Sequence, residues 1–414
     1  MLSQDVPFGK AEATSNEVDL DTALQEVNNE GKPYDPAYDR RDMRRLGRIQ
    51  EVKRRFRFFS IVGYMVILAS TWEYASTSPQ SENKMLRFLV FRYSLVTSVF
   101  SLSNGGTAGT IWLTLIACCG MFLSCLSMAE MASKEIYPRR SPEQLLTSTL
   151  INSRYLAYSR RMSAATSRVE SFAPPGYQKS LSYAVGWLCA LGWQSAMPLI
   201  SYTAAQQVIA LIATCQADFV WKGWQGALLT IAFVVFAILF NMFAINKMPL
   251  IEGLVVTIHI FGFFAFVVIF WVLGPREPAS RVFTEFQDQN GWGSYGLATL
   301  VAVVGPSAAL IGADAAVHLA EELKDASYIL PRAMISSALI NYATAFTMII
   351  SFVSAIDPAL LEDVLATSTG QPWVAVIRHV TGSQAATIAL AVVMCFQFTF
   401  TSINQATTSS RQLW

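Results

Sequence analysis

Residues 295–332, YGLATLVAVVGPSAALIGADAAVHLAEELKDASYILPR, decide the fold. The stretch begins as an apolar run, is interrupted between Gly305 and Gly312, then reaches Asp314 and His318 and ends in a charged segment. The proline in the interruption removes a backbone donor and clashes with the preceding helical turn. In lipid, the carbonyl groups freed in this way are tolerated only where protein or a water-filled cavity meets them. The stretch therefore predicts a membrane helix that opens its backbone to a ligand.

The composition also points to a membrane protein. Hydrophobic residues make up 53% of the chain and charged residues only 14%, with a mean hydropathy of +0.38, whereas ordinary soluble domains carry roughly 25% charge. The apolar residues gather in long runs, which predicts an all-α polytopic protein embedded in the lipid bilayer. The formal net charge of +1 comes from segregated charges, so the sequence gives no support to a nucleic-acid partner.

The cysteines and histidines predict neither a metal nor a cofactor. Most of the six cysteines fall inside apolar runs, and none forms a metal-ligand spacing with the three histidines. Small apolar packing residues are therefore the expected role of these cysteines. The sequence also lacks a recognisable nucleophile–histidine–acid set or phosphate loop, so we do not expect an enzyme.

The first 57 residues are predicted to form a cytoplasmic tail. Residues 1–39 are polar and acidic, which favours disorder, and they contain no apolar core of a cleaved signal peptide. A basic run over residues 40–57 follows, directly before the first apolar span. The positive-inside rule then places the N-terminus in the cytoplasm.

The rest of the chain, residues 58–414, is predicted to be a single transmembrane domain of eight spans. Their expected bounds are 58–75, 107–130, 181–213, 226–245, 250–273, 295–318, 333–356 and 381–403. Basic residues crowd the connections that this topology places inside. Two connections, 76–93 and 134–169, are unusual for their length and polarity, because long structureless loops are uncommon inside compact proteins.

Two of these spans are interrupted, and they lie five spans apart. The first is broken at Thr71-Trp72-Glu73 and the sixth between Gly305 and Gly312. This is the pattern of inverted five-helix repeats, in which two broken helices face each other at the bilayer midplane. There the half-helix N-termini offer unpaired amides to an anionic group, and unwound carbonyl groups can receive a cation.

Several motifs resemble those of the fungal amino acid/choline (GABA) permeases, within the amino acid–polyamine–organocation superfamily. They are NGGTAGTIW (104–112), AEMAS (129–133), FAPPGYQKSLSYAVGWLCALGWQ (172–194), GADAAVHLAEELKDASYILPRAM (312–334) and TTSSRQLW (407–414). The resemblance covers most of the chain from Phe58 onward, and the segment after the sixth span is its most specific part. It implies twelve membrane helices, broken helices 1 and 6, and proton-coupled uptake of amino acids, GABA, choline or polyamines. It also implies the plasma membrane, with the vacuolar membrane as the alternative.

The chain departs from this family pattern in three places. Residues 76–93 intervene after the first span, and residues 134–169 replace a short stretch with a GGQY-like motif. The chain also stops at the end of the eighth span, where the family continues with four more helices. Retained introns and an early stop would produce all three departures, and the alternative is a natural regulatory insertion.

Glu73 and Trp72 are candidate substrate-binding residues of the first break, together with Thr71. Glu73 would be costly to ionise in lipid unless it faces a cavity, so it is expected to meet a cationic substrate group or carry the coupled proton. Trp72 is expected to stack on an ammonium group. The alternatives are an interfacial carboxylate at the end of a shortened helix and an interfacial belt tryptophan.

The sixth span supplies the second set of candidates. The substrate-binding break is assigned to Gly305, Pro306, Ser307, Ala308 and Gly312, with a simple proline kink as the alternative.

Asp314 and His318 are four residues apart and share one helical face. With Glu321 they are expected to gate or couple transport near the cytoplasmic mouth, and Asp314 is also a candidate for the substrate site. A purely structural packing role is the alternative.

Other polar residues in apolar spans are weaker candidates. Gln194 and Gln397 are expected to line the cavity, although interhelical hydrogen bonding is the more frequent role of such residues. Glu252 and His259, both in the fifth span, are expected to have that structural role.

We therefore predict a secondary transporter in which the two breaks face each other around a small amine-bearing substrate. The coupling ion is expected to be a proton. A non-transporting, truncated or mis-spliced permease is the main alternative. A seven-helix receptor and a membrane enzyme are the other classes, and the span count, the paired breaks and the missing catalytic motifs argue against them.

Overall fold

A computed structural model describes residues 54–76, 97–134, 174, 176–216, 218–288, 290–357, 367 and 369–413. These residues belong to one compact unit, Gln50–Trp414. Residues 1–53 of the expected N-terminal tail, which include most of the basic run, lie outside the described residues. So do the two unusual segments 76–93 and 134–169, except for the first residue of each.

Every described element with regular structure is helical, apart from one isolated bridge between Phe56 and Leu323. The longer helices are α3 (Phe58–Ala69), α6 (Thr97–Lys134), α10 (Gln178–Cys215), α11 (Gly223–Ala244), α12 (Met248–Leu273), α17 (Ala326–Ser354), α19 (Pro372–Thr381) and α20 (Gln384–Leu413). The shorter ones are α4 (Thr71–Ser76), η1 (Ile245–Lys247), α13 (Ala279–Thr284), α14 (Tyr295–Ala302), α15 (Val304–Ala309), α16 (Ala315–His318) and η2 (Ala320–Glu322).

Five stretches within the described residues are long and apolar enough to cross a membrane. They are Phe100–Ser133, Gln178–Cys215, Gly223–Leu273, Tyr328–Ser354 and Gln384–Gln412. The third contains both α11 and α12, and it turns large apolar side chains such as Phe243 and Phe261 outward, where lipid would cover them. Two shorter apolar helical stretches, Phe58–Tyr74 and Tyr295–Ala309, are the predicted broken spans. The all-α polytopic membrane class is therefore confirmed.

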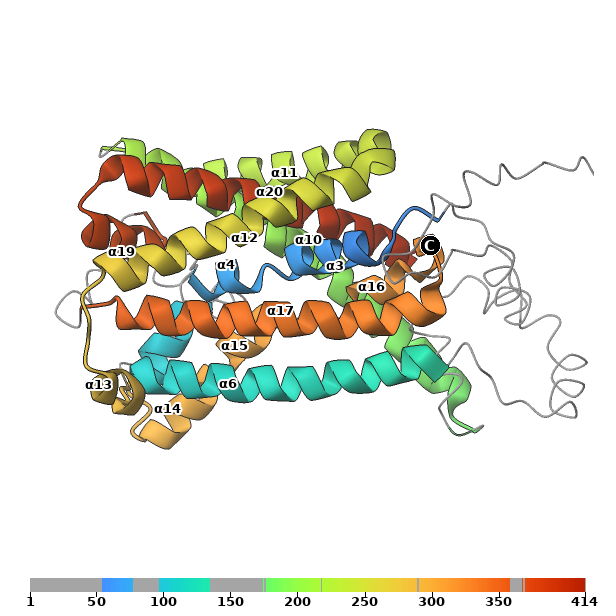
Figure 1. Ribbon diagram of the computed structural model, residues 1–414, viewed down its shortest axis with the longest axis horizontal. Coiled ribbons are helices and arrows are strands. Elements are labelled where there is room, and N and C mark those ends of the chain that lie inside the picture. Colours follow the sequence, from blue (N-terminus) through green and yellow to red (C-terminus); the bar gives the residue numbers. More distant parts are fainter. Residues whose placement is uncertain are drawn as a thin grey trace, which may run out of the picture. The chain divides into compact units, whose positions relative to one another are not determined.

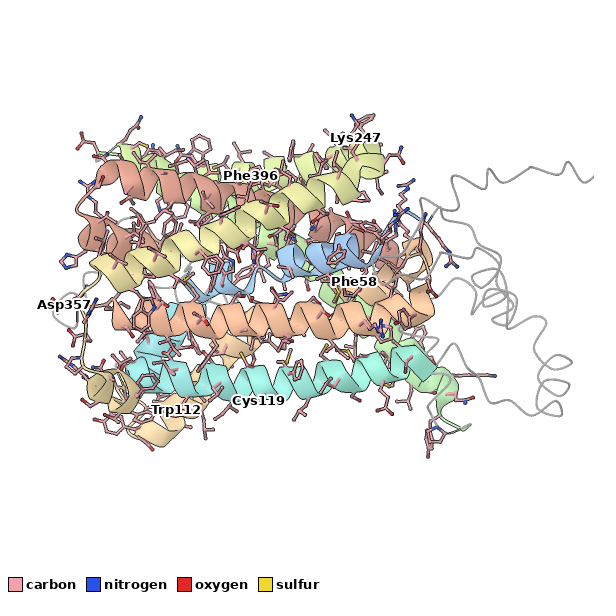
Figure 2. The ribbon with its side chains drawn as sticks, in the orientation of Figure 1. Phe58, Trp112, Cys119, Lys247, Asp357 and Phe396 are labelled. Carbon is pink, nitrogen blue, oxygen red and sulfur yellow. The ribbon has the colours of Figure 1, made fainter. Side chains whose placement is uncertain are left out.

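The broken first span lies at the centre of the helices. Figure 1 shows α3 and α4 in blue between α12, α17 and α20, and α12, α17 and α20 all contact α3. Helix α17 also packs along α6, and α10 packs along α20. Figure 2 places Phe58 and Lys247 toward one end of these helices and Trp112 and Asp357 toward the other. We call these the Phe58 end and the Trp112 end.

The first break is a single residue, Ser70, directly before the predicted Thr71-Trp72-Glu73, which are themselves helical. Helix α3 ends at Ala69, Ser70 adopts a left-handed conformation (φ 42°), and α4 resumes at Thr71. The Ser70 amide donates to the carbonyl of Val66, and the Ser70 and Thr401 hydroxyls donate to that of Ile67 at 2.6 and 3.0 Å. Side chains thus satisfy carbonyl groups that the break frees from the helix, as an apolar environment requires.

The second break differs in position from its prediction. Gly305, Pro306 and Ser307 are helical and lie inside α15, not in an unwound segment. The proline is the third residue of α15, in the first turn, where a missing N–H costs little. The chain leaves the helix after Ala309 instead and returns at Ala315, with Gly312 at φ 121°.

The Asn104-Gly105-Gly106 motif, near the start of α6, packs against the loop that follows α13. Gly106 has φ 66°, and a Cβ there would lie 2.7 Å from the backbone nitrogen of Gln287. The Asn104 side-chain oxygen accepts hydrogen bonds from Asn290 and from the Trp292 indole at 2.9 and 2.7 Å. Helix α6 consequently begins ten residues before the predicted span and includes the motif, with a kink at Gly106.

Candidate functional site

A small pocket of about 10 Å³, close to the room that one water molecule needs, lies between the two breaks. One wall comes from the last turns of α3, a second from the unwound segment after α15, and a third from α17. Its lining residues are Met65, Ala69, Leu310, Gly312, Ala313, Ser337, Ala338, Asn341 and Tyr342. Ala69, next to the first break, and Gly312, in the second, thus line the same pocket.

Helix α17 forms hydrogen bonds with residues at both breaks. The Asn341 amide donates to the carbonyl of Met65 at 3.5 Å, and its backbone carbonyl accepts from the Thr71 hydroxyl at 2.8 Å. The Tyr342 hydroxyl donates to the carbonyl of Leu310 at 3.3 Å, on the second break. A substrate entering the pocket would meet the side-chain amide, the phenol and backbone that is not committed to a helix.

Glu73 and Trp72 do not line this pocket. Both are fully buried in α4 and turn toward α12, where His259 Nδ1 lies 2.7 Å from Glu73 Oε1. The Trp72 ring packs against Phe263 and Phe266 on the same helix. Trp72 is thus placed inside the helix bundle and not at an interfacial surface.

His259 contacts both Trp72 and Glu73. The indole nitrogen of Trp72 lies 3.0 Å from Nε2 and 3.3 Å from Nδ1. Because it is almost equally close to both ring nitrogens, the indole N–H points toward the face of the imidazole ring. Nδ1 is the ring atom that faces the Glu73 carboxyl group.

Asp314 and His318 lie together beyond the second break, with Trp193 of α10. Asp314 Oδ2 is 3.5 Å from His318 Nε2 and accepts a hydrogen bond from the Trp193 indole at 3.3 Å. Trp193 also stacks edge-on against His318 at 5.3 Å. This cluster is separate from the pocket lining, and it bridges α16 to α10.

A second contact lies near the Phe58 end. Glu322, buried in η2, pairs with Arg411 at the end of α20, and the backbone of Arg55 and Phe56 donates to the Glu322 carbonyl. The side chain of Glu321, the predicted gating residue beside it, is not among those described.

The two glutamine candidates lie outside the pocket lining. Gln194 donates to the carbonyl of Ser409 at 2.9 Å and so joins α10 to α20. Gln397 is buried in α20, within the helices that surround α3. The remaining candidates, Ser307 and Ala308, are half-buried in α15.

Sequence reasoning missed the α17 wall of the pocket. Ser337 and Asn341 are four residues apart in an apolar span, which places both on one helical face. That spacing was the available signal, and Tyr342 follows directly. His259 was assigned a general interhelical role, and only the structure places it beside Glu73.

Comparison with known proteins agrees with this architecture. The profile of the amino acid permease family matches residues 85–414. An amino acid/polyamine transporter of Macrophomina phaseolina is 26% identical over 72% of this chain and 62% of its own length. A choline transporter of Saccharomyces cerevisiae is 24% identical over 54% of this chain and 40% of its own length. The corresponding values for a swainsonine transporter of Arthroderma benhamiae are 26%, 59% and 48%.

The chain thus spans about half the length of these curated relatives. The relatives are named as transporters, not as enzymes. The family profile covers well over half of the chain. The described helices of the chain include five apolar stretches that are long enough to cross a membrane. This chain is an integral, multi-pass membrane protein that belongs to the amino acid permease family.

Proposed function

We propose that the chain is a secondary active transporter for amino acids or related amines such as GABA, choline or polyamines, with proton-coupled uptake. The observation that carries this proposal is the pocket between the two broken spans. Paired broken helices around a central site are the arrangement in which many secondary transporters bind their substrates. The relatives' names add amino acids, polyamines and choline as substrate classes.

Binding would require this small pocket to widen as the two breaks separate, and the widened pocket would favour a small zwitterion or cation. Its described lining contains no carboxylate or basic side chain, so a substrate's charges would be met by dipoles and aromatic faces. The carbonyl of Leu310, the Asn341 side-chain oxygen and the face of Tyr342 suit an ammonium group. Backbone amides of the segment around Gly312 would receive a carboxylate, if the substrate has one.

The Glu73–His259 pair would couple transport to protons. In this proposal the pair binds the coupled proton, and before it does so a neutral imidazole and an ionised Glu73 together hold one negative charge. Both side chains are at most 2% exposed, so that charge is costly in an apolar environment. One added proton neutralises the pair. Glu73 belongs to α4, directly after the break, so protonation would bias the break that adjoins the α3 wall of the pocket.

Alternating access would require contacts at the Phe58 end to open. The Glu322–Arg411 ion pair holds η2 against α20 at the Phe58 end. The Trp193–Asp314 hydrogen bond holds the start of α16 against α10 beside the second break. Breaking them would let α3 and the segment around α16 separate from α10 and α20. We place this end in the cytoplasm because of the basic run before α3, and the protein in the plasma membrane.

Uptake by cells that lack their own amino acid and choline permeases tests this function. Cells expressing this chain should accumulate at least one labelled substrate from an amino acid, GABA, choline and spermidine panel. Accumulation should increase as the external pH falls and should collapse with a protonophore. Background uptake of every substrate, with the chain present in the plasma membrane, would show that it does not transport these amines and would favour the non-transporting alternative.

A further inference from the structure

A second buried carboxylate lies on the same face of α12 as His259. Glu252 is fully buried and precedes His259 by seven residues, or two helical turns. Two turns correspond to about 10 Å along the helix axis. Because α12 begins next to Lys247, Glu252 lies nearer the Phe58 end than the Glu73–His259 pair does.

Glu252 faces two other helices through polar groups. Its carboxyl group interacts with the Asn404 side chain of α20 and with Tyr64 of α3. The Tyr64 hydroxyl lies 2.7 Å from both the Asn404 carbonyl and the Thr408 hydroxyl. Within the described part of the chain, neither oxygen of Glu252 and neither side-chain polar atom of Asn404 makes a hydrogen bond of standard geometry.

Tyr64, Glu252 and Asn404 lie where α3, α12 and α20 contact one another, and we call this contact region the seam. Gly63 permits the close approach, since a Cβ there would lie 2.9 Å from the side chain of Val256 and 4.0 Å from the Glu252 carbonyl. Between Glu252 and Glu73, the hydroxyls of Ser70 and Thr401 bond to each other in the same seam. Polar groups therefore follow the seam from the pair at the break to the Phe58 end.

A purely structural polar contact does not need an acid at this position. An amide would donate to Asn404 and remain neutral, whereas an ionised carboxylate buried without a full set of donors is strongly disfavoured. Intramembrane acids that persist in such places are typical of proton relays. The titratable groups on the elements packed around it include Tyr64, His259, Lys247 on η1 and Arg411 on α20, with Glu322 beyond Tyr64.

We propose that Glu252 is a second proton-binding group, which receives the proton that leaves the Glu73–His259 pair and releases it at the Phe58 end. This rests on the proposed function, because it assigns the exit of the coupled proton. The described state holds Glu252 protonated. When α3 separates from α20, Glu252 gives its proton to water at that end.

The Glu73–His259 pair takes up a proton from the Trp112 end. The remaining Glu252 carboxylate is then protonated from the pair, through the hydroxyls of the seam and the water that enters it. The pair regains its negative charge, and one proton has moved along the seam for each cycle. No bond other than those to this proton forms or breaks.

The test compares Glu252→Gln with the unaltered chain and with Glu130→Gln, an exposed glutamate of α6. Two assays are used on each: net accumulation of the labelled substrate at several external pH values, and exchange of internal for external substrate without a proton gradient. Glu252→Gln should lose net accumulation by about tenfold or more and retain exchange. Glu130→Gln should behave as the unaltered chain in both assays.

Net accumulation by Glu252→Gln with unchanged pH dependence would overturn the inference and leave the proposed function standing. If Glu252→Gln does not reach the membrane, Glu252→Asp replaces it. The shorter acid should still support accumulation, with a shifted pH profile, and an unshifted profile would again overturn the inference.

A spectroscopic measurement separates this inference from transport itself. Infrared spectra of the purified full chain should contain the carbonyl band of a protonated carboxyl group in an apolar environment, and Glu252→Gln should lack that band. This result is expected even if no substrate of the panel is transported. An unchanged band in Glu252→Gln would overturn the inference.

Discussion

His259 Nδ1 lies 2.7 Å from Glu73 Oε1, across the contact between α12 and the short helix after the first break. This relationship joins a carboxylate at the break to a titratable ring on a neighbouring membrane helix. Both side chains are buried, so any proton that arrives or leaves changes the charge of a site from which water is largely excluded. The pair is therefore the part of the molecule where protonation and the conformation of the break are most directly connected.

Replacing Glu73 by glutamine should uncouple transport from protons. The amide oxygen still accepts from His259, so the fold around α4 is retained, but the pair no longer carries a negative charge. We expect Glu73→Gln to lose accumulation against a gradient and most of the pH dependence of uptake. Glu73→Asp is the matched control, because it keeps the acid, and it should retain pH dependence. Uptake by Glu73→Gln with an unaltered pH profile would exclude Glu73 from coupling.

Replacing Trp72 by phenylalanine should shift the pH profile of uptake. The substitution removes the indole N–H that contacts the His259 ring and keeps an aromatic ring against Phe263 and Phe266. Because an N–H donor opposes a proton on the ring that it faces, its loss should move half-maximal uptake to higher pH. A downward shift, or none, would contradict a role of the indole N–H in proton binding by the pair.

Replacing Gly106 by alanine should destabilise the protein without touching the pocket. Its φ of 66° and the 2.7 Å approach to the Gln287 backbone leave no room for a Cβ. We expect a loss of about 1–3 kcal/mol in the free energy of unfolding, read as a lower Tm of the purified protein. Gly120→Ala on the same helix is the control, since a Cβ there meets no atom within 4 Å. Equal Tm values for the two variants would contradict this packing.

Replacing Arg411 by glutamine should weaken the closed Phe58 end. Glu322 is 2% exposed and would lose its cationic partner, whereas Arg411 is 26% exposed. A loss of about 1–3 kcal/mol is expected, below the value for a fully buried pair because water screens Arg411. The double variant Arg411→Gln, Glu322→Gln should be more stable than the sum of the single variants predicts. Strict additivity of the Tm changes would indicate that the pair does not interact.

The presence of an interruption in each of the two spans could be predicted from the sequence, but Thr71-Trp72-Glu73 and Gly305-Pro306-Ser307 are helical. Ser70 and Gly312, at the breaks themselves, adopt left-handed or otherwise positive φ values. Pro306 misplaced the second break, since a proline in the first turn of a helix costs no intrahelical hydrogen bond. Sequence alone gives no rule that separates a proline at the start of α15 from one in an unwound segment.

The direction of side chains at the first break could not be predicted. Thr71, Trp72 and Glu73 are consecutive, so they point around α4 in different directions, and the packing of neighbouring helices decides which helix each one contacts. The structure turns Thr71 to α17 and Trp72 and Glu73 to α12. Glu252 and His259 became interpretable only when α3 and α20 were placed beside them, because tertiary contacts determine which intramembrane polar groups meet.

The central claim is that substrate binds in the pocket between the two breaks, and Asn341 tests it most directly. The concentration dependence of initial uptake should be compared between Asn341→Ala and Leu339→Ala, a large exposed side chain two residues earlier on α17. We predict that Asn341→Ala raises KM by about tenfold, the effect of losing one or two substrate hydrogen bonds, and that Leu339→Ala leaves KM unchanged. An unchanged KM in Asn341→Ala, with both variants equally present in the membrane, would contradict the assignment of the pocket as the substrate site.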